Sequence, residues 1–112
     1  MMSKHRTYFK WEIPSTVVKI VNSICADYDR RELIIQHSSA CGDVLEKMIE
    51  LNTIVNNALE SVEPGIRKDI IKDISEGRGY FKSNCCIIME KNTYYRRRRK
   101  LVHDIAVLMN LI

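Results

Sequence analysis

The sequence is poor in the residues that make tight turns. Glycine and proline together account for six of its 112 residues, which leaves little material for the turns of a β-sandwich. Apolar residues make up 46% of the chain and recur mainly at the three-and-four spacing of a helix. The sequence therefore predicts an all-α fold of about five helices in one compact domain.

The cysteines do not have the spacing of a metal site. Cys25, Cys41, Cys85 and Cys86 form no Cys-x-x-Cys pair, and no clustered histidines accompany them. We therefore expect neither a metal nor a cofactor. The adjacent Cys85 and Cys86 are interpreted as two small buried hydrophobic residues rather than as a redox pair, and free thiols suit a reducing cytoplasm.

Long apolar runs are missing as well. No run approaches the ~20 residues of a membrane span, and the first residues lack the apolar centre of a signal peptide. We expect a cytoplasmic protein with no membrane partner.

Motifs of common enzyme classes do not occur. The sequence has no glycine-rich phosphate loop, no His-Glu-x-x-His and no Gly-x-Ser-x-Gly. His5, His37 and His103 are isolated in sequence. Asp69 and Asp73 lie four residues apart, but helices commonly carry such pairs on solvated surfaces. We therefore expect no enzymatic activity.

Positive charge, by contrast, is concentrated in one part of the chain. The net charge is +4, but residues 78–100 alone carry +7, so the rest of the chain carries −3. The cations of this window are Arg78, Lys82, Lys91, Arg96, Arg97, Arg98, Arg99 and Lys100. Such a local excess favours an anionic partner at one site over a protein that is sticky on all sides.

The basic residues belong to a stretch with helical periodicity. Residues 92–100 contain two tyrosines followed by five cations, and an apolar segment comes next. At helical spacing Tyr94, Leu101, Ile105 and Leu108 lie on one side. This pattern predicts a final helix from about residue 93 to residue 110, with a core-facing stripe and a cationic outer face. A solvated basic tail is the alternative, but the continuous stripe favours a docked helix that binds nucleic acid.

Residues 1–62 predict an arm and a pair of helices. The aromatic residues of the arm, Tyr8, Phe9 and Trp11, are expected to dock on the core. Ser15 is expected to cap a first helix from about residue 16 to residue 36. A second helix is predicted over residues 42–61. We favour an antiparallel hairpin of these two helices over a dimer seam, in which Asn52, Asn56 and Asn57 would restrain the register.

Residues 63–112 predict a helix-turn-helix unit. A short helix over about residues 65–75 should end at the two glycines of Gly77-Arg78-Gly79. Tyr80 and Phe81 are expected to anchor in the core. Ser83 should cap another short helix from Asn84 to about residue 89, with Cys86, Ile87 and Met89 available inward. Asn92 or Thr93 should cap the final basic helix.

The last 55 or so residues resemble the phage late-gene transcription regulators of the ArpU and RinA type. The similar segments are Ala58-Leu59 and residues 66–71, 93–98 and 105–111. In that group a threonine followed by an apolar or aromatic residue opens the recognition helix, and basic positions follow. The resemblance implies a DNA-binding unit similar to region 4 of sigma-70 factors, whose last helix enters the major groove while the preceding helix braces across the backbone.

This resemblance also implies roles for individual residues. Those implied to reach base edges are Asn92, Thr93, Tyr95, Arg96 and Arg99. Those implied to contact phosphate are Arg78, Lys82, Ser83, Asn84, Lys91, Arg97, Arg98 and Lys100. For Tyr95, packing in the core is an equal alternative.

Three functions are compatible with these residues. The first is a sequence-specific DNA-binding transcriptional regulator of phage or prophage origin, with double-stranded DNA as its partner. Contact with RNA polymerase and homodimerisation stay open for it. The second is a small terminase-like subunit for packaging phage DNA. The third is an interaction protein whose basic helix binds an acidic protein, RNA or an anionic surface.

Overall fold

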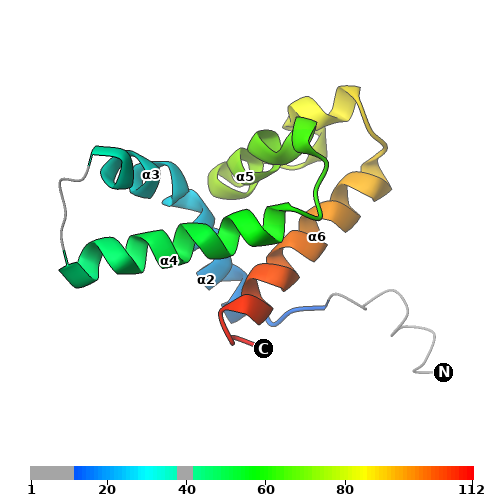
Figure 1. Cartoon of the computed structure of the whole chain (residues 1–112). Coiled ribbons are helices and arrows are strands. Elements are labelled where there is room, and N and C mark those ends of the chain that lie inside the picture. The colour runs from blue at the N-terminus through cyan, green and yellow to red at the C-terminus, as the bar shows by residue number, and fades with distance from the viewer. Residues whose placement is uncertain (1–11, 38–41) are drawn as a thin grey trace.

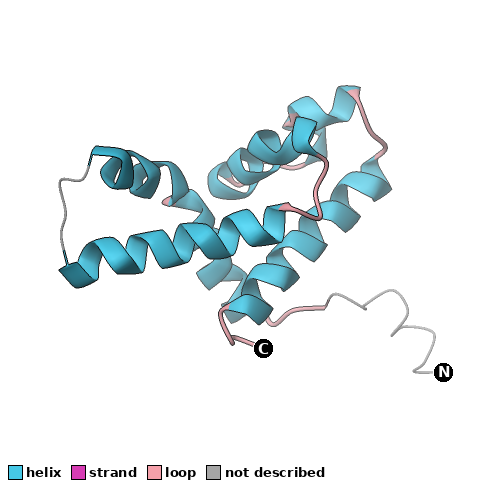
Figure 2. Ribbon diagram, viewed as in Figure 1, coloured by secondary structure: helices cyan, strands magenta, loops and turns pink. Residues whose placement is uncertain are grey.

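The computed structural model of the chain describes residues 12–37 and 42–112. Most of these residues are helical and none of them forms a β-strand (Figure 2), so the all-α prediction is confirmed for the described part of the chain. The α-helices are α2 (Ser15–Ala26), α3 (Tyr28–His37), α4 (Gly42–Leu59), α5 (Arg67–Glu76) and α6 (Lys91–Leu108). The 3₁₀ helices are η1 (Pro64–Ile66), η2 (Tyr80–Lys82) and η3 (Asn84–Ile87). The docking expected of Tyr8, Phe9 and Trp11 lies outside the described residues.

The first predicted helix is divided in two. It was expected to continue to about residue 36, but α2 ends at Ala26 and α3 begins at Tyr28. The division falls at Asp27, whose φ and ψ of −98° and 5° leave the helical region. The cap expected at Ser15 is also wrong, since α2 begins at Ser15 itself and no side chain caps it.

Because of this division, α2 and α3 have different neighbours. α2 contacts α5 and α6, whereas α3 contacts α4 (Figure 1). The expected hairpin of the first two predicted helices is therefore made by α3 and α4 alone. α2 instead contributes Val17, Val21 and Cys25 to the main core. That core is shared by segments on both sides of the boundary expected after residue 62.

A polar cluster with Arg31 and Asn52 buried at its centre fixes α3 against α2 and α4. The Arg31 side chain donates to Asn52 Oδ1 at 2.6 Å and to the carbonyl of Ile24 at 2.7 Å. The Tyr28 hydroxyl donates to Asn56 Oδ1 at 2.6 Å. Two of the asparagines considered for a dimer seam therefore set the register within one chain. Arg31 is only 3% exposed, and its bond to Ile24 satisfies a carbonyl in the last turn of α2.

The segment between α5 and α6 follows the predicted order, with differences in detail. Gly77 ends α5 with a left-handed φ of 69°, as expected. Ser83 caps η3 by accepting from the N–H of Cys85 at 3.0 Å. The inward positions expected for Phe81 and Ile87 are wrong, because these side chains are 76% and 83% exposed.

The short length of η3 explains part of this difference. The predicted helix was expected to run to about residue 89, but η3 ends at Ile87. With three residues per turn, a single 3₁₀ turn has little inward surface. That surface falls on Cys85, which is fully buried, and not on Cys86 or Ile87.

In the described part of the chain, no helix combines the length and the apolar character needed to cross a lipid bilayer.

Candidate nucleic-acid interface

The basic helix α6 is anchored to the core along one side. Tyr94, Leu101 and Ile105 are fully buried, as predicted, and Val102 and Ala106 are buried beside them. The expected burial of Leu108 is wrong, because 46% of this residue is exposed. α6 ends there, and a turn through Asn110 (φ 59°) places Met109 and Leu111 against the core in its place.

α6 begins two residues earlier than its expected caps allow. Its N-cap is Glu90 and its first residue is Lys91, with no side-chain cap. The prediction that Asn92 or Thr93 caps the helix is therefore wrong. Both residues lie inside the first turn, and the Asn92 side chain is exposed.

A buried carboxylate connects α5 with α6. Asp73, on α5, is fully buried and accepts from the Tyr94 hydroxyl at 2.8 Å. It also binds Arg78 Nε at 3.2 Å. The expectation of a solvated surface pair at Asp69 and Asp73 is therefore wrong for Asp73. Its position three residues after the buried Ile70 is the sequence signal that places it on the inner stripe of α5.

Arg98 extends this cluster from α6. Its guanidinium donates to the Tyr94 hydroxyl at 2.8 Å and to the carbonyl of Arg78. It also lies 5.9 Å from the centroid of the Tyr94 ring. Arg98 is therefore half-buried and used within the fold, although the resemblance implies a phosphate contact for it.

Tyr80 and Tyr95 attach the loop between α5 and α6 to the helix. The Tyr95 hydroxyl accepts from the N–H of Tyr80 at 3.1 Å, and the Tyr80 hydroxyl donates to the carbonyl of Met89 at 2.5 Å. The Tyr94 and Tyr95 rings meet edge to face at 5.1 Å. For Tyr95, the structure thus favours packing over contact with a base.

The outer side of α6 carries a line of exposed polar side chains. Asn92, Arg96 and Arg99 are spaced four and three residues apart, so they lie along one line of the helix, on the side away from Tyr94 and Leu101. All three are exposed. Within the described part of the chain, no hydrogen bond or ion pair is made by Arg96 or Arg99.

The other cations of the basic block have acidic neighbours. Arg97 binds Glu63 at 3.0 Å, and Lys100 binds Asp104 at 2.6 Å. The hydrogen bond from Arg97 lowers the pKa of Glu63, and the same bond raises the pKa of Arg97. These contacts direct the two cations to the side of the helix, away from the line of Asn92, Arg96 and Arg99.

The remaining residues predicted to contact phosphate differ in their exposure to solvent and in their partners within the fold. Lys82, Asn84 and Lys91 are exposed next to the start of α6, and the Lys91 ammonium lies 5.3 Å from the centroid of the Phe81 ring. Ser83 is buried, so its hydroxyl is not available to a partner on the surface. Besides Asp73, Arg78 binds Glu76 at 3.3 Å.

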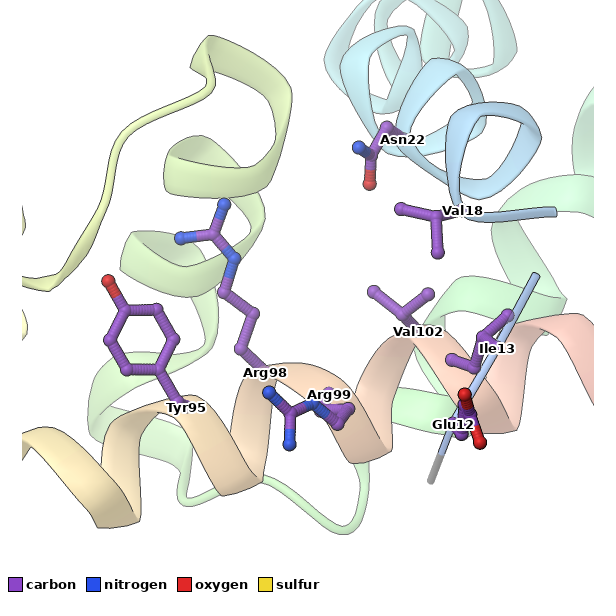
Figure 3. A pocket seen from close by; sticks show the side chains of 8 residues that line it. All are labelled: Glu12, Ile13, Val18, Asn22, Tyr95, Arg98, Arg99 and Val102. Carbon is purple, nitrogen blue, oxygen red and sulfur yellow. The ribbon is translucent and has the colours of Figure 1, made fainter. Parts of the chain in front are cut away.

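A hollow of about 360 Å³ lies between α2 and α6 (Figure 3). Figure 3 shows Val18 of α2 facing Val102 of α6, with Arg98 and Arg99 leaving α6 in different directions. The hollow is lined by Glu12, Ile13, Val18, Asn22, Tyr95, Arg98, Arg99 and Val102. Since Arg98 is held by contacts within the fold, Arg99 is the lining cation that a partner can bind.

Comparisons with known proteins add no relative. No family model matches the chain, and neither a curated protein nor a solved structure matches it. Among the described residues, no three side chains of histidine, cysteine, aspartate or glutamate are grouped so as to hold a metal ion.

The buried Tyr94 predicts a loss of stability at high pH. Burial, and then the hydrogen bond to Asp73, raise the pKa of Tyr94 from 10.0 to about 12. The folded protein therefore holds this proton more tightly than the unfolded chain. The resulting stabilisation is fully present below pH 10 and is lost as the pH rises through about 12. Burial raises the pKa of Cys25 from 9.0 to about 12 in the same sense.

We therefore expect the free energy of unfolding, measured by urea denaturation, to fall as the pH rises from about 9 to 11. In the double variant Tyr94→Phe, Cys25→Ala the free energy of unfolding should fall less steeply over this range, since both the Tyr94 hydroxyl and the Cys25 thiol are absent. An equally steep fall in this variant would contradict the assignment of the pH dependence to these two groups.

Proposed function

We propose that the protein is a sequence-specific DNA-binding transcriptional regulator whose helix α6 enters the major groove. One observation carries the proposal. Asn92, Arg96 and Arg99 form an exposed line on α6, Arg96 and Arg99 have no partner in the described part of the chain, and the side of α6 that carries Tyr94 and Leu101 is fixed in the core. A helix fixed in this way holds the backbone positions of these side chains before DNA binds, so less backbone entropy is lost on binding.

The dimensions of α6 suit this role. An α-helix with its side chains is about 10–12 Å wide, and the major groove is about 12 Å wide. Asn92 and Arg99 are seven residues apart, or about 10 Å along the helix axis. That length corresponds to about three base pairs at 3.4 Å each. We therefore expect one copy of the protein to read a core of three or four base pairs.

The side chains on this line match particular bases. An arginine can donate two hydrogen bonds to O6 and N7 of guanine, and an asparagine can pair with N6 and N7 of adenine. Arg96 and Arg99 are thus assigned to guanine and Asn92 to adenine. Lys82, Lys91 and Lys100 are assigned to phosphates, where they would set the orientation of the protein without selecting sequence.

The resemblance to phage late-gene regulators of the ArpU and RinA type supports a regulator over a packaging subunit. In that setting a phage or prophage origin and a contact with RNA polymerase are further parts of the proposal. The resemblance rests on residues 58–111 alone, and the geometry of α6 is an independent support.

The test is the selection of bound duplexes from a random pool at moderate salt. We expect a recurring motif that contains guanines and binds on the order of 10³-fold or more tightly than random duplex. The logarithm of the affinity should also fall with the logarithm of the salt concentration, by about 0.9 for each phosphate neutralised. Tight binding without a preferred motif would overturn the regulator in favour of a packaging subunit. No binding to any duplex would leave an acidic protein as the partner of the basic helix.

A further inference from the structure

The hollow between α2 and α6 has the size and the apolar walls of a small-molecule site. Its volume of about 360 Å³ falls within the range of about 300–1,000 Å³ for such sites, which are lined mainly by apolar side chains with a few polar groups. Val18 of α2 faces Val102 of α6 (Figure 3), and Ile13 is a third aliphatic residue of the lining. These walls favour a ligand with an apolar body over an inorganic ion.

Two polar side chains of the lining are available to such a ligand. Asn22 on α2 is half-buried, and its side-chain amide makes no hydrogen bond to any residue of the described part of the chain. Arg99 on α6 is exposed and has no partner there either. Both side chains offer N–H donors, so together they favour a ligand group that accepts hydrogen bonds.

The charge of the lining favours a ligand with one negative charge. Arg98 and Arg99 contribute +2 and Glu12 contributes −1, which leaves +1 in total. The Arg98 guanidinium donates to two neutral acceptors, the Tyr94 hydroxyl and the carbonyl of Arg78, and pairs with no acid among the described residues. Its charge therefore still acts on the hollow. A carboxylate carries a single charge and matches the two parallel N–H donors of an arginine.

We propose that this hollow binds a small monocarboxylate with an apolar body. Arg99 and Asn22 hold the carboxylate. The apolar body lies between Val18 and Val102, where it is removed from water. The arginine fixes the orientation of the ligand, because two parallel hydrogen bonds to a carboxylate allow little rotation.

Arg99 is shared by this site and the exposed line of α6. It lines the hollow, whereas Asn92 and Arg96 of the same line do not. A guanidinium that pairs with a carboxylate through two N–H groups cannot use the same groups for guanine. This consequence rests on the proposed function: if α6 reads DNA, the bound carboxylate lowers the affinity of the protein for DNA.

Binding is tested on the full chain without DNA. The probes are indole-3-acetate, phenylacetate and hexanoate, each compared with the primary alcohol of the same skeleton. We expect at least one acid to shift the amide NMR signals of α2 and α6 around the hollow saturably, with a dissociation constant on the order of 1 mM or lower. The matching alcohol lacks the charge and should bind about 10-fold more weakly.

Arg99→Gln should weaken the binding of that acid about 10-fold. Its matched control is Arg96→Gln, which removes the same charge from an exposed arginine outside the hollow and should bind as tightly as the native chain. Val18→Phe narrows the hollow from the side of α2 and should also weaken binding about 10-fold. No saturable binding of any of the three acids up to about 10 mM would overturn the proposal, as would equal binding of acid and alcohol or equal losses in the two arginine variants.

The competition with DNA is measured separately, with a selected duplex. A saturating acid should weaken duplex binding by the native chain about 10-fold and should leave duplex binding by Arg99→Gln unchanged. An unchanged affinity of the native chain would overturn the competition for Arg99. Failure of the chain to bind any duplex would count against the proposed function alone, because the NMR titration decides the ligand site without DNA.

Discussion

Replacing Arg96 and Arg99 together by alanine is expected to weaken binding to a selected duplex on the order of 10²- to 10⁴-fold. A two-bond contact from arginine to guanine contributes about 1–3 kcal/mol of discrimination. The two side chains lie on the exposed line of α6 and have no competing partner in the described part of the chain. No interaction of the folded protein is lost with them, so the whole effect should appear in binding and the melting temperature should be unchanged.

The control for this prediction removes the same amount of charge elsewhere. Lys19 on α2 and Lys72 on α5 are both exposed, and their double replacement by alanine lowers the net charge by the same two units. We expect it to weaken binding only slightly. Lys100→Ala, at a position assigned to phosphate, should weaken selected and random duplexes alike. If Arg96→Ala and Arg99→Ala also act equally on both kinds of duplex, their assignment to base edges is wrong.

Helical periodicity predicted most of the fold because the core side chains repeat in regular stripes. Tyr94, Leu101 and Ile105 were placed correctly on α6, and Gly77 was placed correctly at the end of α5. The division at Asp27 was missed because neither proline nor glycine marks it. It depends on the guanidinium of Arg31 reaching back to the carbonyl of Ile24, and a local pattern does not contain that contact.

The candidate site was predicted in composition but only partly in orientation. A block of consecutive arginines gives no indication of which side chains turn inward. Arg98 was assigned to phosphate, yet its guanidinium lies between Tyr94 and the carbonyl of Arg78. Arg97 is directed by Glu63, which is 34 residues away in sequence. Such partners come from distant parts of the chain, so only the structure separates Arg96 and Arg99 from their neighbours.

Asp73 is a single polar residue in the apolar stripe of α5, and we expect the stability of the fold to depend strongly on it. We expect Asp73→Ala to lower the free energy of unfolding by about 3 kcal/mol, measured by urea denaturation. The change leaves the buried Tyr94 hydroxyl without the acceptor for its proton and removes the partner of Arg78 Nε. Removing one member of a buried charged pair costs about 3–5 kcal/mol. The lower value applies here because the Arg78 side chain is 31% exposed and can be solvated.

Variants of neighbouring residues locate this effect in the bond between Asp73 and Tyr94. Asp69→Ala changes the same residue type one turn earlier in α5, at a half-buried position where the carboxylate accepts a long bond from Asn84 at 3.4 Å. As the loss of a carboxylate in the first turn of a helix, it should lower stability by about 1 kcal/mol or less. Tyr94→Phe removes only the hydroxyl and should cost less than Asp73→Ala. Because both changes remove the same bond, their double variant should be less destabilised than the sum of the two, by about 1–3 kcal/mol. Additive effects, or a cost for Asp73→Ala no larger than for Asp69→Ala, would show that this bond does not hold α6 against α5.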